Sequence, residues 1–210
     1  MHPSRFDAIA FDLLTALIDS WSLWSAVAGN DELGRRWRTE SLGRVTAAGA
    51  YRPYEDIVRE ATVAVGLPAE KADELLSRWP ELKPWPEAPG ILQQLRGRRL
   101  AIVTNCSQRL AELAAAATSG TFEIIMSAER AGYYKTAPEA YQAGLAALGL
   151  PAERVLFVAG SPHDVPGAGA VGMPVYWANR AGAAIPVGAP PPLMVASDLL
   201  LLPGLIERSE

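Results

Sequence analysis

The chain has 210 residues, of which 50% are hydrophobic and 20% charged, and its net charge at pH 7 is −4. This composition is typical of a globular protein with one domain, or with one domain that carries an inserted cap. The acidic balance and the lack of a basic run disfavour nucleic acid as a partner. A single cysteine, Cys106, excludes an internal disulfide and fits a reducing compartment. The first apolar run is too short to span a bilayer, so we expect a cytoplasmic protein with no membrane partner.

Short apolar runs recur along the chain, and their length and residue types predict buried strands. They lie at residues 8–11, 100–103, 122–126, 155–158 and 174–177. Segments with helical patterns separate them, notably 108–117 and 138–148, and Gly149 is placed to end the second helix. This alternation predicts an α/β fold with a Rossmann-like parallel sheet as its core. Residues 194–196 are expected to add a last edge strand.

The stretch from about residue 19 to residue 86 breaks this alternation. It contains no convincing strand, but it has amphipathic helical patterns such as 53–65 and 69–78. A stiff return to the sheet follows, with prolines at positions 80, 84, 86 and 89. We therefore predict an all-helical cap domain at residues 18–88, inserted into a core domain made of residues 1–17 and 89–210.

Polar side chains follow several of the predicted strands, where ligands bind in open parallel sheets. Asp12 ends the first strand, and an ionised carboxylate there is partly desolvated and needs donors around it. A carboxylate can act as a nucleophile and form an ester that water then hydrolyses. A nearby lysine would keep it ionised, and Thr or Asn would supply hydrogen-bond donors. The remaining members of this set are Thr104, Asn105, Lys135, Ser161 and Asp164.

The order of these residues resembles the four motifs of the haloacid dehalogenase (HAD) superfamily. The motifs are Phe11-Asp12, Thr104-Asn105, Lys135 and Gly160-Ser161-Pro162-His163-Asp164. Three local features further resemble the L-2-haloacid dehalogenase branch: Trp37-Arg38 with Leu42, Tyr133-Tyr134-Lys135 with Tyr141, and residues 155–158 leading to Trp177-Ala178-Asn179-Arg180-Ala181-Gly182. The resemblance covers nearly the whole chain and implies a HAD-like core with a helical cap.

Within this branch the resemblance implies a role for each matching residue. The nucleophile is Asp12, the arginine for the substrate carboxylate and halide is Arg38, the motif-two donors are Thr104 and Asn105, the lysine is Lys135, the substrate-proximal tyrosine is Tyr141, and the last acidic residue is Asp164. The implied reaction is attack of the Asp12 carboxylate on C2 of a small 2-substituted carboxylic acid, after which water opens the ester. The resemblance implies neither a metal nor another cofactor, and a homodimer is a family expectation.

The loop after Asp12 departs from two patterns of the superfamily. Phosphatases carry a second Asp where this chain has Leu14, and an acidic residue where it has Gly160. Without these residues Mg²⁺ has few hard oxygen ligands and phosphoryl transfer has no proton donor, which disfavours a phosphatase. Dehalogenases usually have Gly then Thr where this chain has Thr15 and Ala16. The hydroxyl has therefore either moved by one residue or left the site.

The fourth motif also departs from the branch. Dehalogenases present Ser and Asn that help to place the hydrolytic water, where this chain offers Ala159 and Ser161, and His163 replaces an expected aromatic residue. These changes leave room for another leaving group. Relatives of the branch open the strained ring of L-azetidine-2-carboxylate by C–N cleavage, and His163 is a candidate donor of the proton that the nitrogen needs. A third hypothesis is a binding module that has lost full activity.

Several candidates also have plain structural interpretations. Arg38 shares one helical region with three other arginines, most of which must be solvated, so the sequence leaves open which one points inward. Tyr141 could serve core packing alone, and His163 could be an ordinary loop residue. The tryptophans of the cap could line a pocket or pack the cap against the core (Trp21, Trp24 and Trp37). For Cys106 we expect a buried, inert thiol.

Overall fold

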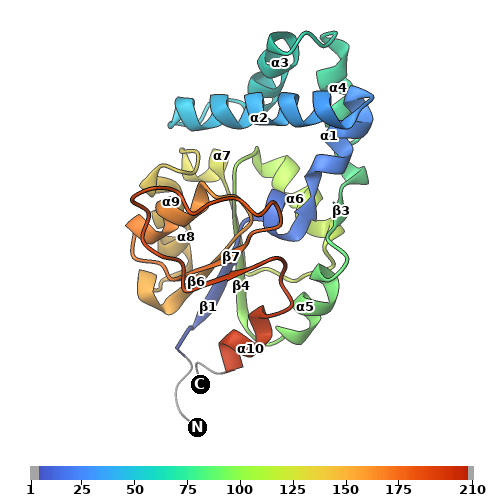
Figure 1. Ribbon diagram of the computed structural model, residues 1–210. Coiled ribbons are helices and arrows are strands. Elements are labelled where there is room, and N and C mark those ends of the chain that lie inside the picture. Colours follow the sequence, from blue (N-terminus) through green and yellow to red (C-terminus); the bar gives the residue numbers. More distant parts are fainter. Residues whose placement is uncertain (1–4, 208–210) are drawn as a thin grey trace.

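A parallel sheet forms the centre of the molecule (Figure 1). The computed structural model describes residues 5–207 and, within them, a sheet of six strands in the order β5-β4-β1-β6-β7-β8. The strands are β1 (Ala8–Phe11), β4 (Arg99–Thr104), β5 (Ile124–Ser127), β6 (Val155–Ala159), β7 (Val175–Ala178) and β8 (Met194–Ala196). The predicted α/β class and Rossmann-like parallel sheet are confirmed, with strand ends that differ by one or two residues from those expected.

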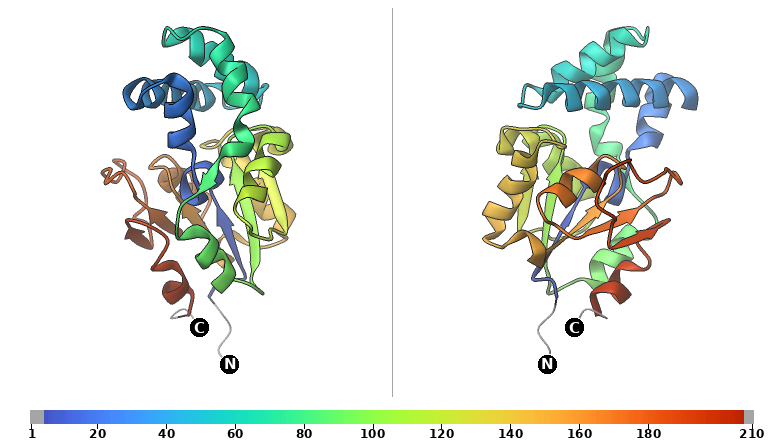
Figure 2. Two further views of the ribbon diagram at one scale, coloured as in Figure 1. Left: turned by 90° about the vertical axis from the view of Figure 1, so that its right-hand side faces the viewer. Right: turned by 60° about the vertical axis from the view of Figure 1, so that its left-hand side comes forward.

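The sheet separates the apolar side chains into two cores, because successive side chains of a strand point to opposite faces. Ile9 and Phe11 join the core that includes α5 (Ala88–Gln94) and α6 (Gln108–Ala117). Ala8 and Ala10 join the core that includes α8 (Pro138–Leu148) and α9 (Asp164–Ala170). Helices thus cover both faces (Figures 1 and 2), which explains why β1 is an uninterrupted apolar run.

The predicted core helices have the expected bounds. The segments 108–117 and 138–148 are α6 and α8, and α8 ends at Gly149, whose φ of 65° lies in the left-handed region that suits glycine. The remaining core elements are α7 (Ala128–Ala131), the 3-10 turn η3 (Ala152–Arg154) and α10 (Leu202–Glu207). None of the helices within residues 5–207 combines the length and the apolar character needed to cross a bilayer.

A second layer of helices lies beyond the carboxyl ends of the strands (Figure 1). It contains α1 (Ser20–Ala28), α2 (Asp31–Ala48), α3 (Tyr54–Ala64) and α4 (Glu70–Ser77), followed by the 3-10 turn η2 (Trp79–Glu81). The helical patterns at 53–65 and 69–78 correspond to α3 and α4. In all views α2 lies across the top of the core, so its underside faces the strand ends (Figures 1 and 2).

Two short strands join the layers. The segments that leave and re-enter the core run side by side (Figure 2), and β2 (Ile18–Asp19) pairs antiparallel with β3 (Lys83–Pro84). The expectation of no strand between residues 19 and 86 is therefore wrong at this point. Two residues are too few to show an alternating pattern, and backbone pairing of two passing segments leaves no signal in the side chains.

Candidate active site

The carboxylate of Asp12 is held by the loop that follows it. Asp12 comes directly after β1 and caps a π-helical turn, η1 (Leu13–Leu17). Its Oδ2 accepts hydrogen bonds from the Thr15 amide at 2.9 Å, the Thr15 hydroxyl at 2.5 Å and the Ala16 amide at 3.2 Å. The hydroxyl has therefore moved by one residue along the loop and still reaches the carboxylate. Three donors saturate this one oxygen.

Lys135 bridges the carboxylates of Asp12 and Asp164. Its Nζ donates to Oδ1 of Asp12 at 2.8 Å and to Oδ2 of Asp164 at 3.1 Å. The hydroxyl of Tyr141 donates to the other oxygen of Asp164 at 2.8 Å, so Tyr141 does more than pack the core. The exposed fractions are 6% for Asp12, 3% for Lys135 and 3% for Asp164. Three charged groups that lie far apart in the sequence, each predicted to follow a strand, are therefore in direct contact in the structure.

The electrostatic setting differs between the two carboxylates. Burial is the largest influence on the pKa of Asp12 and raises it, but the Lys135 ammonium and the Thr15 donors outweigh burial and hold this pKa below its usual range. Burial, together with the nearby Asp12, raises the pKa of Asp164 above its usual range. Burial lowers the pKa of Lys135, yet the two carboxylates outweigh it and the pKa is raised. Asp12 is therefore ionised at neutral pH and Lys135 is charged.

Arg38 is the inward-facing arginine of α2. Its side chain is buried, with 2% exposed, whereas Arg35 and Arg36 are exposed. The guanidinium carbon lies 4.7 Å from the centroid of the Trp21 ring, and Nη2 donates to the Leu14 carbonyl at 3.4 Å. Among residues 5–207 its Nε has no hydrogen-bond partner. Arg38 therefore faces the loop of Asp12 from the helical layer with donor capacity left over.

Asn105 holds the backbone of Lys135. Its Nδ2 donates to the Lys135 carbonyl at 2.8 Å, and its Oδ1 accepts from the Lys135 amide at 2.7 Å. The sequence predicted a donor to the substrate, and the structure adds a positioning contact that the motif did not reveal. Within residues 5–207 the second amide hydrogen of Asn105 has no recorded partner and could bind a ligand. Thr104 is buried at the end of β4.

Cys106 lies two residues after Thr104. Burial raises the pKa of its thiol to about 12, so this thiol is protonated and unreactive, as expected.

Of the polar side chains of the fourth motif, only Asp164 contacts Lys135 in the described structure. Asp164 begins α9 and meets Lys135, but Ser161 is half-buried and its Oγ accepts a hydrogen bond at 3.3 Å from the amide of His163. His163 is exposed. In the described structure neither Ser161 nor His163 forms a side-chain hydrogen bond with Asp12 or Lys135. Short loops before helices often use serine in this local way, and the catalytic role of Ser161 stays a prediction.

Gly160 is required by the packing of the Asp12 loop. A Cβ at this position would lie 2.3 Å from the Thr15 carbonyl carbon and 2.4 Å from the Ala16 nitrogen. No side chain, and so no acidic side chain, fits there. Leu14 is buried and apolar, and residues 5–207 contain no group of three or more His, Cys, Asp or Glu placed to hold a metal. The residues at this site therefore do not fit the Mg²⁺ ion of the superfamily's phosphatases.

The chain is similar to known hydrolases over most of its length. The model of the haloacid dehalogenase-like hydrolase family matches residues 6–172. Haloacetate dehalogenase H-2 of Moraxella sp. (strain B) is 32% identical, with 85% of this chain and 88% of that protein covered. The (S)-2-haloacid dehalogenase H-109 of Pseudomonas putida is 28% identical, with 84% and 87% covered.

Solved structures show the same likeness. The crystal structure of an L-2-haloacid dehalogenase superposes with a TM-score of 0.87 at 27% identity, over 97% of this chain and 100% of that one. The fold is also that of L-2-haloacid dehalogenase from Xanthobacter autotrophicus, with a TM-score of 0.85 at 22% identity over 96% and 98% of the two chains. The chain belongs to the haloacid dehalogenase-like hydrolase family, as a hydrolase of its L-2-haloacid dehalogenase branch.

Proposed function

We propose that this enzyme hydrolyses the carbon–halogen bond at C2 of a small 2-haloalkanoic acid through a covalent ester on Asp12. The observation that carries the proposal is that the two oxygens of Asp12 accept different numbers of hydrogen bonds. Oδ2 accepts three hydrogen bonds, whereas Oδ1 accepts one, from Lys135. The relatives named as haloacetate and (S)-2-haloacid dehalogenases support the substrate class.

Oδ1 is the attacking oxygen in this proposal, because it keeps lone pairs that no loop donor occupies. It forms a bond to C2 of the substrate while the halide leaves with the bonding electron pair. Lys135 keeps the carboxylate ionised and, with Asp164 and Tyr141 behind it, fixes its orientation. Asn105 contributes by holding the Lys135 backbone.

The same loop would serve the second step. Once Oδ1 carries the substrate, Oδ2 is the carbonyl oxygen of the ester, and water attacks Cγ of Asp12. Negative charge then develops on Oδ2, where the Thr15 and Ala16 amides and the Thr15 hydroxyl already point. Collapse of this intermediate releases a 2-hydroxy acid that carries Oδ1 and leaves the water oxygen in Asp12.

Arg38 supplies the argument for an acidic substrate. In the described structure this buried guanidinium has cation–π contacts with Trp21 and Trp24 and a bond to a carbonyl, but no carboxylate within ion-pair distance. A buried cation without a counterion is costly, so an ion pair between Arg38 and an anionic substrate would offset this cost and favour binding. We propose that residues 18–88 form the cap domain that brings Arg38 over the core domain of residues 1–17 and 89–210 and shields the ester from bulk water.

The other hypotheses are less well supported. The exposed position of His163 takes away the proton donor suggested for C–N ring opening. The complete set of Asp12, Thr15, Lys135 and Asp164 argues against a mere binding module, and Leu14 with Gly160 argues against a phosphatase. The homodimer and the cytoplasmic location stay predictions.

The test measures chloride release from chloroacetate and from L-2-chloropropionate. A third arm measures formation of 2-hydroxy-4-aminobutyrate from L-azetidine-2-carboxylate. Asp12→Asn should abolish turnover, whereas Asp7→Asn should keep it, since Asp7 is a surface residue paired with Arg154. Single-turnover reaction in ¹⁸O-labelled water should place one label in Asp12. Turnover of neither haloacid, or activity without label in Asp12, would contradict the proposal.

A further inference from the structure

The backbone carbonyls of the Asp12 loop are bound from outside the loop. The indole N–H of Trp85 donates to the Thr15 carbonyl at 3.0 Å, and Nη2 of Arg180 donates to the Ala16 carbonyl at 3.3 Å. The backbone amide of Trp85 donates to the Leu17 carbonyl at 2.9 Å. Three consecutive carbonyls are thus fixed by two distant residues: Trp85 lies 70 positions after Thr15, and Arg180 lies 164 positions after Ala16.

One of these bonds acts on the same peptide group that faces the carboxylate. The Thr15 carbonyl and the Ala16 amide belong to one planar peptide unit, with C=O and N–H pointing in opposite directions. Trp85 binds the oxygen of this unit, and the amide hydrogen points at Oδ2 of Asp12. Holding the carbonyl therefore fixes the direction of the amide, and a hydrogen bond at one end of a peptide group strengthens the bond at the other.

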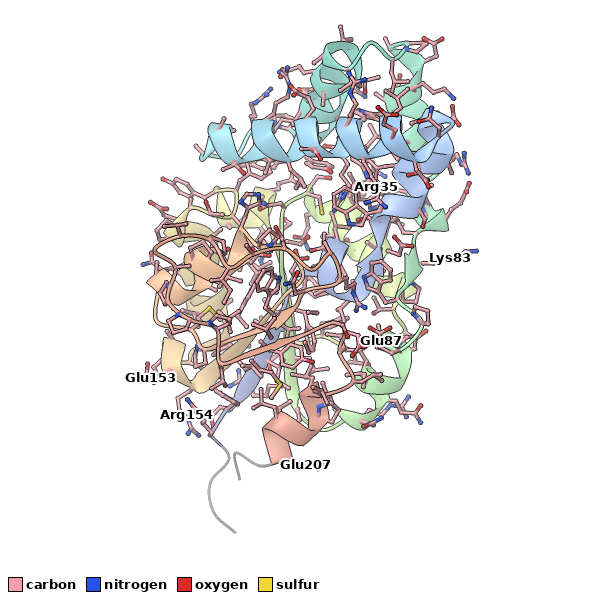
Figure 3. The ribbon with its side chains drawn as sticks, in the orientation of Figure 1. Arg35, Lys83, Glu87, Glu153, Arg154 and Glu207 are labelled. Atoms are coloured by element: carbon pink, nitrogen blue, oxygen red, sulfur yellow. The ribbon has the colours of Figure 1, made fainter. Side chains whose placement is uncertain are left out.

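Arg180 and Glu87 brace the indole. The Arg180 guanidinium carbon lies 4.4 Å from the centroid of the Trp85 ring, and its Nη2 donates to Glu87 at 2.5 Å. The side chains of Arg180 and Glu87 are only 18% and 16% exposed. Figure 3 shows Glu87, on the segment that follows β3, within the outline of the molecule, whereas the side chain of Lys83, in β3 itself, points outward. Trp85, Glu87 and Arg180 form a unit that we call the loop brace.

We propose that Trp85, supported by Arg180, is a positioning residue that orients the Thr15–Ala16 peptide towards Oδ2 of Asp12. This inference rests on the proposed role of Asp12. It also gives a function to the Trp177–Gly182 segment, which the sequence singled out and which the catalytic cluster does not use. Neither Trp85 nor Arg180 touches Asp12 directly, so their effect passes through the loop backbone.

The test is Trp85→Phe, which keeps an aromatic ring against Arg180 but removes the indole N–H. Since removal of a direct oxyanion donor typically costs 10²–10³ in kcat, we expect about a tenfold loss for a residue one bond removed, with KM unchanged. The acid limb of the kcat profile should move to higher pH, because weaker donors to Oδ2 stabilise the ionised Asp12 less. The substitution leaves the other titratable groups around Asp12 unchanged in the sequence: Lys135, Asp164, Tyr141, Arg38 and Cys106.

Trp79→Phe is the matched control. The indole N–H of this buried tryptophan donates to the Leu110 carbonyl, also at 3.0 Å, rather than to a carbonyl of the Asp12 loop. Its variant should lose some stability but keep kcat and the acid limb. If Trp85→Phe behaves like Trp79→Phe in both readouts, the positioning role is refuted.

Arg180→Lys provides a second measurement should Trp85→Phe not fold. It keeps the charge beside Glu87 but removes the planar group that stacks on the indole, and we expect a lower kcat and the same direction of the pH shift. Wild-type values for Arg180→Lys would overturn the proposal. The two levels of inference stay separable: an active Asp12→Asn variant contradicts the proposed function, whereas an inactive Asp12→Asn with an unaffected Trp85→Phe contradicts the loop brace alone.

Discussion

Replacement of Lys135 by methionine tests the central cluster most directly. Lys135 is 3% exposed and bridges Asp12 at 2.8 Å and Asp164 at 3.0 Å. Methionine fills similar space but leaves two buried carboxylates without their shared cation. Removing one partner of a buried ion pair costs about 3–5 kcal/mol, so the free energy of unfolding at pH 7 should fall by about that amount, and turnover should be lost.

The pH dependence of this loss has a defined sign. In the wild type the lowered pKa of Asp12 contributes stability above the pKa of the unfolded chain, and this contribution disappears as the pH falls through the folded value. Without Lys135 burial should raise the pKa of both carboxylates above that of the unfolded chain, so the folded variant should take up protons and gain stability as the pH falls. The difference between variant and wild type should therefore shrink between pH 7 and pH 5.

Urea unfolding at the two pH values measures both effects. Lys135→Met combined with Asp164→Asn should recover part of the stability at pH 7, because one buried charge is removed. Lys135→Arg is the control that keeps the charge. A loss below about 1 kcal/mol for Lys135→Met, or an equal loss at pH 5 and pH 7, would refute the explanation by unpaired buried charge.

Three further substitutions test the surroundings of this cluster. Thr15→Val removes the hydroxyl on Oδ2 at similar volume, so kcat measured by chloride release should fall about 10²-fold, and an unchanged kcat would contradict the oxyanion role. Gly160→Ala places a Cβ against the Thr15–Ala16 backbone and should cost about 1–3 kcal/mol in urea unfolding as well as activity, whereas Gly43→Ala, which meets no atom within 4 Å, should cost neither. Arg38→Lys keeps the charge but loses the planar contact with Trp21, so KM should rise about tenfold while the exposed Arg35→Lys leaves it unchanged; equal KM values would argue against substrate binding by Arg38.

The sequence predicted those parts of the site that follow from strand ends. Asp12 follows β1, Lys135 lies between α7 and α8 in the connection beyond β5, and Asp164 begins α9 after β6. The parallel strands bring all three to one edge of the sheet. The sequence analysis leaves open which arginine of α2 points inward, yet the sequence contains a signal. The buried positions of α2 are Gly34, Trp37, Arg38, Ser41 and Val45, a spacing that selects Arg38 over its neighbours Arg35 and Arg36.

Other contacts had no signal in the sequence. The bonds of Asn105 to the Lys135 backbone and of Trp85 to the Thr15 carbonyl join a side chain to a main-chain group. Main-chain groups are the same at every position, so such a pairing cannot be read from residue types. The direction of the Ser161 side chain in the fourth motif cannot be read from residue types either, because it depends on the backbone turn before α9.

An apolar loop is an unusual neighbour for a buried, ionised carboxylate, and the geometry of the loop after Asp12 explains its choice of residues. Leu13, Leu14, Ala16 and Leu17 bury their side chains in the core and so anchor the π-helical turn. The backbone of the loop then makes its polar contacts: two of its amides donate to Asp12, whereas its carbonyls accept hydrogen bonds from Ser20, Arg38, Trp85 and Arg180. A polar side chain at one of the buried positions would weaken that anchor and compete for these bonds. An apolar sequence is therefore what a loop that binds through its main chain requires.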